Sequence, residues 1–258
     1  MNILITNDDS IDSTGLRLLA EAASEIGNVT VVAPATEQSG KSVGINYLHP
    51  IRVQEIDWGD KFKVWKAEGS PADCVKLALG PLLDKKPDVI LSGINFGSNS
   101  GRTVLYSGTV GGAIEGVMRG VPSIAFSCCQ EEGDLSHVKP YLTSLIEHLL
   151  EVDFHDGTLF NVNFPCHAID EFSGIKFAKQ GRGYWIEKPV EIDLPGGTHY
   201  HLGGKGAAFE EDPASDVALL LQGYITAVPI HISELTDHDH YVAHQKTFET
   251  INTKFSFD

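Results

Sequence analysis

The chain begins Met1-Asn2-Ile3-Leu4-Ile5-Thr6-Asn7-Asp8-Asp9, and this stretch decides the fold class. Residues 1–6 form a short apolar run bounded by polar residues, which predicts a buried strand. Asp8 and Asp9 then follow the carboxyl end of that strand, where open α/β sheets bind their ligands. Two adjacent carboxylates repel each other unless a positive charge lies near them, and a hard divalent cation is the usual partner. The alternative is a turn or a helix cap, because aspartate favours both.

The following segments complete a unit of strand, helix and strand. Apolar residues at helical spacing over 16–26 predict a helix that ends near Gly27. Residues 29–34 then predict a second buried strand. Because a right-handed crossover unit brings both strand ends to one edge of a parallel sheet, we expect Ser39, in the next loop, to lie near the acidic pair.

Composition restricts the class of protein. The 258 residues suffice for one large domain, and 35 acidic against 19 basic side chains give a net charge of −16. This charge disfavours an unaided binding surface for nucleic acid or for an anionic membrane. No signal peptide or membrane span is expected, because the first apolar run is short and acidic residues follow it. Reduced thiols and a cytoplasmic location are expected, since no CxxC spacing occurs among Cys74, Cys128, Cys129 and Cys166.

Two later segments place polar groups at the end of a strand and at the start of a helix. Residues 87–94 predict a buried strand, and the loop 95–101 contains glycines that let backbone amides approach a ligand. Residues 106–113 open a helix with small side chains in its first turn, so its N–H groups are expected to be free for an anion. The lysine of a P-loop and the GxGxxG fingerprint are both absent, which argues against an NTPase or a dinucleotide site. An ordinary turn and a tightly packed helix start are the structural alternatives.

Five motifs follow one another along the first half of the chain. They are Thr6-Asn7-Asp8-Asp9, Ser39-Gly40, Gly69-Ser70-Pro71-Ala72-Asp73-Cys74, Ser92-Gly93-Ile94-Asn95 with Gly97 and Asn99, and Tyr106-Ser107-Gly108-Thr109-Val110. In this order and spacing they resemble the SurE survival-protein family of metal-dependent 5′/3′-nucleotidases. The resemblance covers residues 1–127 and continues weakly through 215–218 and 223–229.

The resemblance implies an α/β fold with a Rossmann-like, mainly parallel sheet flanked by helices. It implies one divalent cation per subunit, Mg²⁺ or Mn²⁺, with the ligands Asp8, Asp9, Ser39 and Asn95. It also implies a binding site for the phosphate of the substrate, made of Asn99, Ser107, Gly108 and Thr109. Oxygen ligands of these kinds suit both metals. A metal-bound water, deprotonated with help from one of the two aspartates, would then attack phosphorus. The expected substrates are nucleoside 5′-monophosphates, with 3′-monophosphates as further candidates.

The C-terminal part of the chain carries weaker signals. We expect a single domain over 1–258, with an α/β core in 1–173 and the hairpin extension, last core elements and tail in 174–258. Strand-like pieces that alternate with glycine, proline and charge over 174–204 predict the hairpin. By resemblance, this extension and an exchanged segment over 234–258 would build a homodimer or homotetramer. A helical surface tail is the alternative for 234–258.

Ser10 departs from the family pattern, which usually has glycine after the aspartate pair. If this position needs a positive φ, serine is strained there by about 1 kcal/mol. The departure keeps open a nucleotide-binding or assembly protein without turnover. An enzyme with an aspartate nucleophile is a second alternative, although the chain lacks a DxD spacing at the pair. A third alternative is a zinc site formed from the histidines His199, His201, His238, His240 and His244.

Overall fold

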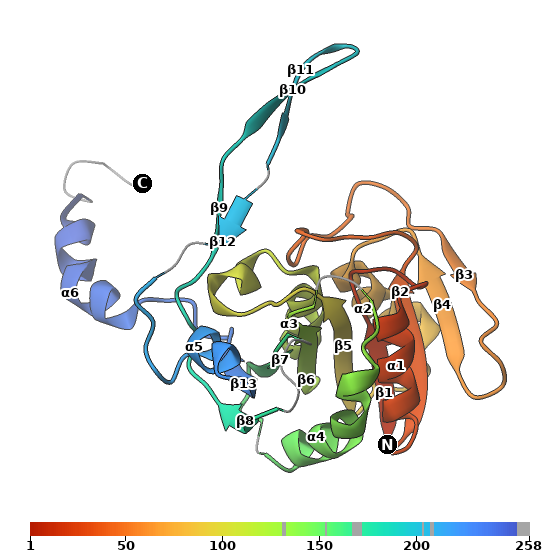
Figure 1. The fold of residues 1–258 in the computed structure, drawn as a ribbon. Helices are drawn as coiled ribbons and strands as arrows, with labels where there is room; N and C mark the ends of the chain where they lie inside the picture. The colour runs from red at the N-terminus through yellow and green to blue at the C-terminus, as the bar shows by residue number, and fades with distance from the viewer. Residues whose placement is uncertain (131–132, 153, 167–171, 203, 207–208, 252–258) are drawn as a thin grey trace, which may run out of the picture.

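The computed structural model describes residues 1–258 apart from 131–132, 153, 167–171, 203, 207–208 and 252–258. A nine-stranded sheet with the order β3-β4-β2-β1-β5-β6-β7-β13-β8 forms its centre (Figure 1). The strands are β1 (Asn2–Thr6), β2 (Asn28–Pro34), β3 (Val53–Glu55), β4 (Lys63–Ala67), β5 (Val89–Phe96), β6 (Ser123–Cys128), β7 (Thr158–Phe164), β8 (Gly174–Phe177) and β13 (Tyr224–His231). The strands from β4 to β7 in this order are parallel, whereas β13 runs antiparallel to β7. The predicted mainly parallel sheet is therefore confirmed.

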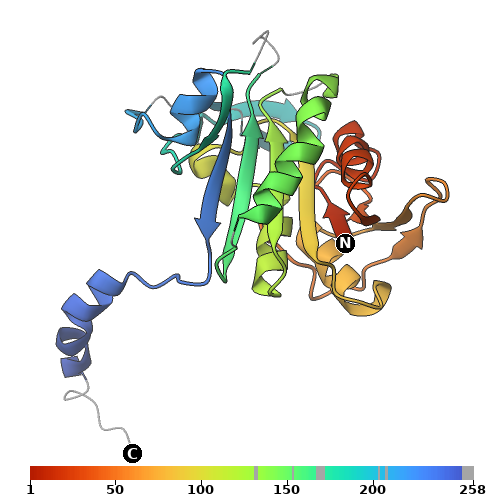
Figure 2. The same cartoon turned by 90° about the horizontal axis from the view of Figure 1, so that it is seen from below.

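Helices cover both faces of this sheet (Figures 1 and 2). α1 (Thr14–Ala23) and α4 (Lys139–Glu151) contact each other and share one hydrophobic core with the sheet. α2 (Pro71–Leu77) and α3 (Gly108–Met118) contact each other and belong to two further core clusters. α5 (Asp216–Leu221) packs on β13. Three short helical turns complete the set: Ala78–Leu82, Gly101–Leu105 and Ser136–Val138.

The start of α2 follows its sequence closely. Ser70 Oγ accepts a hydrogen bond from Asp73 N at 3.1 Å, and Asp73 Oδ2 accepts one from Ser70 N at 2.9 Å. This capping box satisfies two N–H groups that would otherwise have no partner. Asp73 also accepts a hydrogen bond from Asn46 Nδ2 at 2.7 Å. The cap therefore also fixes the long loop between β2 and β3.

Parallel pairing brings the polar loops of the chain to one edge of the sheet. In the register of the strands, Thr6 at the end of β1 lies opposite Ser92 in β5. Near the end of β5, Asn95 lies opposite Ser127 in β6. The residues that follow these strands therefore converge at the carboxyl edge, as open α/β sheets require for a ligand site.

The C-terminal region differs in part from the prediction. Residues 174–177 were expected in the hairpin extension, but they form β8, which pairs with β13 in the main sheet. The extension, here called the arm, spans 185–206 and contains β9 (Trp185–Glu187), β10 (Val190–Leu194), β11 (Gly197–His201) and β12 (Gly204–Gly206). It projects from the body of the molecule (Figure 1). The distant partner of β8 explains the error, because no local pattern reveals such pairing.

The segment after β13 leads away from the sheet. It contains α6 (His238–Glu249), none of whose residues is buried, and this helix stands apart from the body in both views (Figures 1 and 2). Residues 252–258 of the predicted exchange segment lie outside the described part. Within the described ranges, no helix has both the length and the apolar character needed to cross a membrane.

The cysteines correct one expectation. A disulfide joins Cys129 and Cys166, whose Cα atoms are 4.8 Å apart, although reduced thiols were expected throughout. Cys129 follows β6 and Cys166 follows β7, and these strands are paired neighbours, so strand pairing places the two side chains together. A separation of 37 residues gives no sequence signal for this contact. Cys74 and Cys128 are buried reduced thiols, and the cytoplasmic location stays a prediction.

Reduction of this disulfide is expected to destabilise the protein. A crosslink that closes a loop of 37 residues restricts the unfolded chain, which corresponds to about 3–4 kcal/mol of stability. Urea unfolding with and without dithiothreitol measures the effect, and a Cys129→Ala/Cys166→Ala double variant is the control. The reductant should lower the midpoint of the wild type and leave that of the double variant unchanged. An unchanged wild-type midpoint would show that the bond adds no stability.

Candidate active site

A cavity of about 600 Å³ opens at the carboxyl edge of the sheet. Five of the predicted site residues line it: Asp8, Ser39, Asn95, Asn99 and Ser107. The other three contact residues that line it: Asp9 accepts a hydrogen bond from Phe96, and Gly108 and Thr109 contact Asp8. The structure thus gathers loops that follow β1, β2 and β5 with the start of α3.

Asp8 is held by the first turn of α3. Its side chain is 3 % exposed, and Thr109 Oγ1 donates a hydrogen bond to Asp8 Oδ1. Burial raises the pKa of Asp8, while hydrogen bonds from Thr109 and from the backbone N–H groups of Thr109 and Gly108 oppose the rise. A Cβ atom at Gly108 would lie 2.8 Å from Asp8 Cβ and 2.9 Å from Asp8 Oδ2. Glycine at this position therefore makes room for the carboxylate.

Asp9 links the end of β1 to the end of β5. Its Oδ2 atom accepts a hydrogen bond from Phe96 N at 3.2 Å. Burial, followed by the charge of Asp8, raises the pKa of Asp9 to about 7, and Glu37 adds to the rise. Without a cation, it is therefore unfavourable for both carboxylates to be fully ionised at neutral pH. A divalent cation at the pair would remove this repulsion.

Ser39 and Asn95 add two uncharged oxygen groups beside the pair. The loop that carries Ser39 is tied to the acidic loop, because Gln38 N donates to the carbonyl oxygen of Asp8 at 2.7 Å. Ser39 Oγ donates to Glu37 Oε1 at 2.7 Å. Asn95 Nδ2 donates to Gly97 O at 2.7 Å, which leaves the side-chain oxygen of Asn95 as its atom for a cation. Carboxylate, hydroxyl and amide oxygens are a fitting donor set for Mg²⁺ or Mn²⁺.

The first turn of α3 corrects one detail of the sequence prediction. Its N–H groups were expected to be free, but those of Gly108 and Thr109 face Asp8, and Val110 N donates to Ser107 Oγ at 3.1 Å. The small side chains that suggested an open anion site instead let Asp8 approach the helix. At this turn it is Ser107 that lines the cavity.

Asn99 is fixed in the cavity wall by β6 and β7. Its Nδ2 atom donates to Ser127 Oγ at 2.8 Å, and its backbone N–H donates to Asn163 Oδ1 at 2.8 Å. Its carbonyl oxygen accepts a hydrogen bond from Asn161 Nδ2 at 2.9 Å. These contacts hold the loop after β5 over neighbouring strands, so it can face a ligand in a defined conformation.

Ser10 adopts the backbone conformation that the sequence analysis considered for it. Its φ angle is 103°, a region that favours glycine. The loop is nevertheless held on both sides, because Asn7 Nδ2 donates to Ser10 O at 2.9 Å and Ile11 N donates to Pro34 O at 2.8 Å. The serine is thus strained without displacing the acidic pair.

Replacement of Ser10 by glycine is expected to stabilise the fold by about 1–2 kcal/mol, because the positive φ no longer costs energy. Urea unfolding of the metal-free protein measures the change. Ser13→Gly is the matched control, since Ser13 has a φ of −64° and should gain nothing. Equal or lower stability of Ser10→Gly would argue against strain at this position.

Asp216, in the segment 215–218 where the resemblance continues weakly, is a buried residue of this region for which the sequence predicted no role. Its carboxylate accepts hydrogen bonds from Gly101 N at 3.0 Å, Gly181 N at 2.8 Å and Val217 N at 2.8 Å. Burial raises its pKa, and these donors oppose the rise. Asp216 therefore ties the segment before the arm to the loop that follows Asn99.

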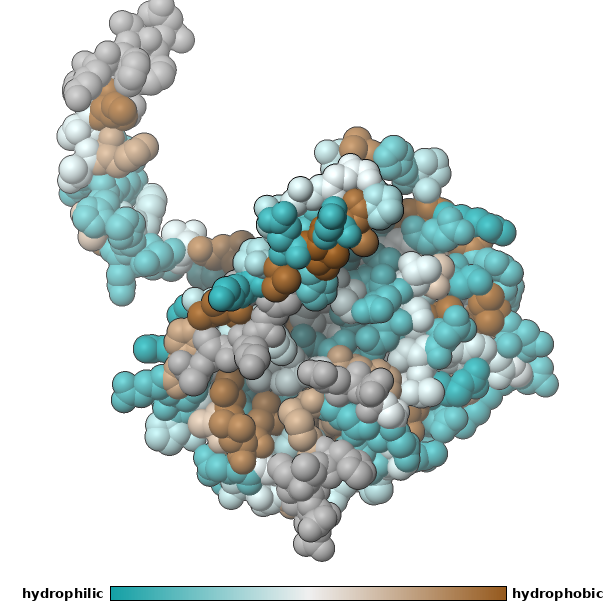
Figure 3. Space-filling view, turned by 45° about the horizontal axis from the view of Figure 1, so that its top comes forward, coloured by the Kyte–Doolittle hydropathy of each residue, from teal (hydrophilic) through white to brown (hydrophobic). Residues whose placement is uncertain are grey.

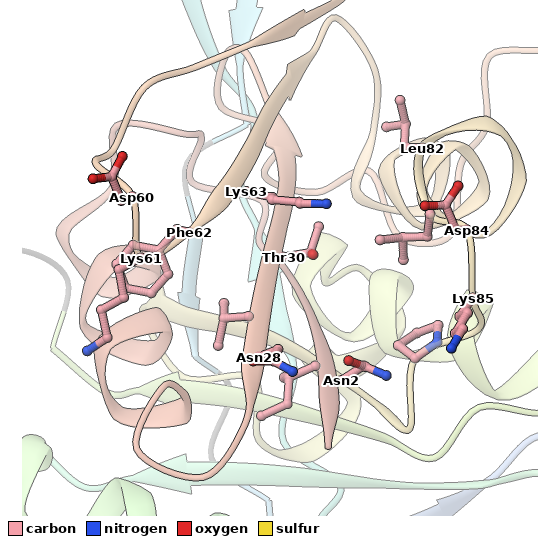
Figure 4. A pocket seen from close by; sticks show the side chains of 14 residues that line it. Asn2, Asn28, Thr30, Asp60, Lys61, Phe62, Lys63, Leu82, Asp84 and Lys85 are labelled. Atoms are coloured by element: carbon pink, nitrogen blue, oxygen red, sulfur yellow. The ribbon is translucent and has the colours of Figure 1, made fainter.

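The other candidate locations do not assemble a comparable site. Within the described residues, no three side chains of histidine, cysteine, aspartate or glutamate are placed to hold a metal ion. A second cavity of about 460 Å³ lies at the opposite edge of the sheet, where β1 and β2 begin. Asp60 and Asp84 lie on opposite sides of this cavity, and Lys63 lies between them (Figure 4). None of the predicted site residues lines it.

The sheet and the oxygen-rich cavity at its carboxyl edge define a class of α/β protein with a small-molecule site at the strand ends. The model of the family described as "Survival protein SurE" matches residues 3–187, so the chain belongs to this family.

Relatives extend the similarity over most of the chain. A protein of Protochlamydia amoebophila named 5′-nucleotidase SurE is 40 % identical over 252 residues, which is 96 % of this chain and 97 % of the relative. A protein of Chlorobaculum tepidum with the same name is 39 % identical over 92 % of this chain and 90 % of its own length. The crystal structure of the SurE protein from Aquifex aeolicus superposes with a TM-score of 0.82 at 33 % identity, covering 96 % of this chain and all of that chain.

Proposed function

We propose that this protein is a 5′-nucleotidase that hydrolyses nucleoside 5′-monophosphates to nucleoside and phosphate, with 3′-monophosphates as further substrates. The observation that carries the proposal is the acidic pair, the buried Asp8 and the half-buried Asp9, beside a cavity with hydroxyl and amide groups. The names of the relatives agree with this chemistry.

We infer that one divalent cation per subunit, Mg²⁺ or Mn²⁺, binds at the acidic pair. Four side chains would hold it: Asp8, Asp9, Ser39 and Asn95. The raised pKa of Asp9 supports this inference, because burial and the nearby charge of Asp8 make its ionised form costly, and a cation would relieve that cost. When bound, the cation supplies positive charge that stabilises the phosphate and activates water.

The residues around the pair have separate roles in this proposal. Ser107 and Asn99 line the cavity and bind the phosphate, while Gly108 and Thr109 position Asp8. Asp9 accepts the proton of the attacking water, because fewer donors engage its carboxylate than engage that of Asp8. Water attacks phosphorus directly, the bond between phosphorus and the ribose oxygen breaks, and the departing ribose oxygen takes up a proton from solvent.

Assembly belongs to the same proposal. Hydrophobic side chains are exposed on the arm and on α6, including Ile186 (52 %), Tyr200 (61 %) and Phe248 (75 %). Figure 3 shows such side chains along the arm and on the tail helix, interspersed with hydrophilic ones. We propose that the arm and residues 234–258 form the contacts of a homodimer or homotetramer, closed by symmetry. Sedimentation of only a 28.0 kDa species at micromolar concentration would contradict it.

The catalytic proposal is tested by phosphate release from a panel of nucleoside 5′- and 3′-monophosphates, with Mg²⁺, Mn²⁺ or neither. Inorganic pyrophosphate and a phosphodiester, which are substrates of other phosphatase classes, are included for comparison. We expect metal-dependent release from the nucleoside monophosphates. Metal-dependent cleavage of the phosphodiester alone would assign the cavity to a different reaction.

A further inference from the structure

The cavity beside the acidic pair has a second kind of wall. The first residues of the arm, Tyr184 and Trp185, contribute aromatic side chains to it, and Gly183 and Val217 line the same stretch. None of these residues belongs to the motifs that gather the oxygen ligands. The cavity therefore combines polar groups for a phosphate with aromatic surface that phosphate binding does not use.

The aromatic wall is fastened to the phosphate side of the cavity. Arg102 N donates a hydrogen bond to Gly183 O at 2.6 Å, directly before the two aromatic residues. The contact is too close for any side chain at Gly101, since a Cβ atom there would lie 2.4 Å from Gly183 O. Asp216 binds both Gly101 N and Gly181 N. The start of the arm thus keeps a fixed position relative to the loop of Asn99.

The two aromatic side chains differ in their surroundings. The ring of Tyr184 stacks on that of Phe209, with 5.0 Å between the ring centroids and 30° between the ring planes. Tyr184 is therefore supported from behind. Trp185 is 46 % exposed and lines the cavity. Trp185 thus offers an exposed aromatic surface beside Tyr184, which Phe209 supports, and a flat ligand ring can cover such a surface.

We propose that Trp185, flanked by Tyr184, forms a nucleobase subsite in which the base of the substrate stacks on the indole. This inference rests on the proposed function and names the part of the substrate that the aromatic wall binds. A cavity of about 600 Å³ lies within the range of small-molecule sites of about 300–1,000 Å³. Gly183 and Val217 offer no polar side-chain atoms to read the edge of a base. Stacking on an aromatic face tolerates any base, so the subsite recognises that a base is present and accepts purines and pyrimidines alike.

The experiment compares two phosphomonoesters that differ in the base. Adenosine 5′-monophosphate carries a base, and ribose 5-phosphate has the same ester without one. For Trp185→Ala we expect kcat/KM for adenosine 5′-monophosphate, divided by kcat/KM for ribose 5-phosphate, to fall roughly tenfold. Loss of one stacking aromatic side chain typically has an effect of this size. Trp185→Phe should restore most of the ratio, and Tyr47→Ala, at an exposed position outside the cavity, should not change it. An unchanged ratio in Trp185→Ala would overturn the proposal.

A binding measurement separates this inference from the catalytic one. Adenosine 5′-monophosphate should quench the tryptophan fluorescence of the wild type, and ribose 5-phosphate should not. The quenching should be lost in Trp185→Phe, which retains Trp58 and Trp65. If neither ester is hydrolysed but the nucleotide still quenches Trp185, the proposed catalysis fails and the subsite stands. If hydrolysis proceeds and quenching persists in Trp185→Phe, the subsite is wrong and the catalysis stands.

Discussion

Asp9→Asn is expected to abolish nucleotidase activity, with kcat/KM reduced by about 10³-fold or more. The amide keeps the shape of the side chain, and it removes one negative charge from the proposed cation site and the proton acceptor of the reaction. Activity and Mn²⁺ affinity are measured side by side, with circular dichroism as a check on the fold. Asp12→Asn is the matched control, because Asp12 lies in the next turn of the chain and is exposed. Activity near that of the wild type at low metal would contradict the assignment.

The same substitution should stabilise the metal-free protein at high pH. The pKa of Asp9 is raised to about 7 in the fold from an ordinary value of 3.8, so the folded state binds more protons between these values. The contribution of Asp9 to the stability of the metal-free protein therefore falls as the pH rises from about 4 to about 7. Asp9→Asn lacks this dependence and should exceed the wild type at pH 8 by at least about 1.4 kcal/mol, the equivalent of one pKa unit. Urea unfolding with a chelator at pH 5 and pH 8 measures it, and a variant less stable than the wild type at pH 8 would refute the account.

Gly108→Ala is expected to have the second largest effect, a loss of about 10²-fold in kcat/KM, because it displaces the Asp8 carboxylate that we propose as a ligand of the cation. The added Cβ would lie 2.8 Å from Asp8 Cβ, so either the carboxylate or the first turn of α3 must shift. Helix propensity alone favours alanine over glycine. A loss caused by the substitution would therefore come from the contact with Asp8 and not from a weaker helix.

The control for this variant is Gly80→Ala, because a Cβ atom at Gly80 meets nothing within 4 Å. Activity and Mn²⁺ binding are measured for both variants, together with their unfolding midpoints. We expect Gly80→Ala to keep full activity. Full activity of Gly108→Ala would show that the contact between Gly108 and Asp8 has no catalytic importance.

The polar side of the site was predictable from the sequence for a physical reason. Asp8 follows one apolar run and Asn95 lies at the end of another. Parallel strands bring such positions to the same edge of the sheet. The positive φ of Ser10 could also be predicted, because serine stands at a position where the family usually has glycine. The capped start of α2 at Ser70 was predictable because its hydrogen bonds are local.

The features that the sequence did not reveal depend on contacts between distant segments. Trp185 lies far along the chain from the acidic pair and reaches the cavity because hydrogen bonds from Gly181 N to Asp216 and from Arg102 N to Gly183 O fasten the start of the arm. The disulfide depends on the pairing of β6 with β7. The N–H groups of Gly108 and Thr109 were expected to be free, since spacing alone cannot show that Asp8 packs against them.

The central claim is that the acidic pair at the end of β1 drives metal-dependent hydrolysis of a nucleoside monophosphate. Its most direct test is phosphate release from adenosine 5′-monophosphate by chelator-treated protein as Mn²⁺ is added back, for the wild type and Asp9→Asn. We expect no release without metal, saturable recovery in the wild type and no recovery in the variant. Full release in the presence of chelator, or a phosphorylated enzyme trapped on Asp8 or Asp9, would contradict it.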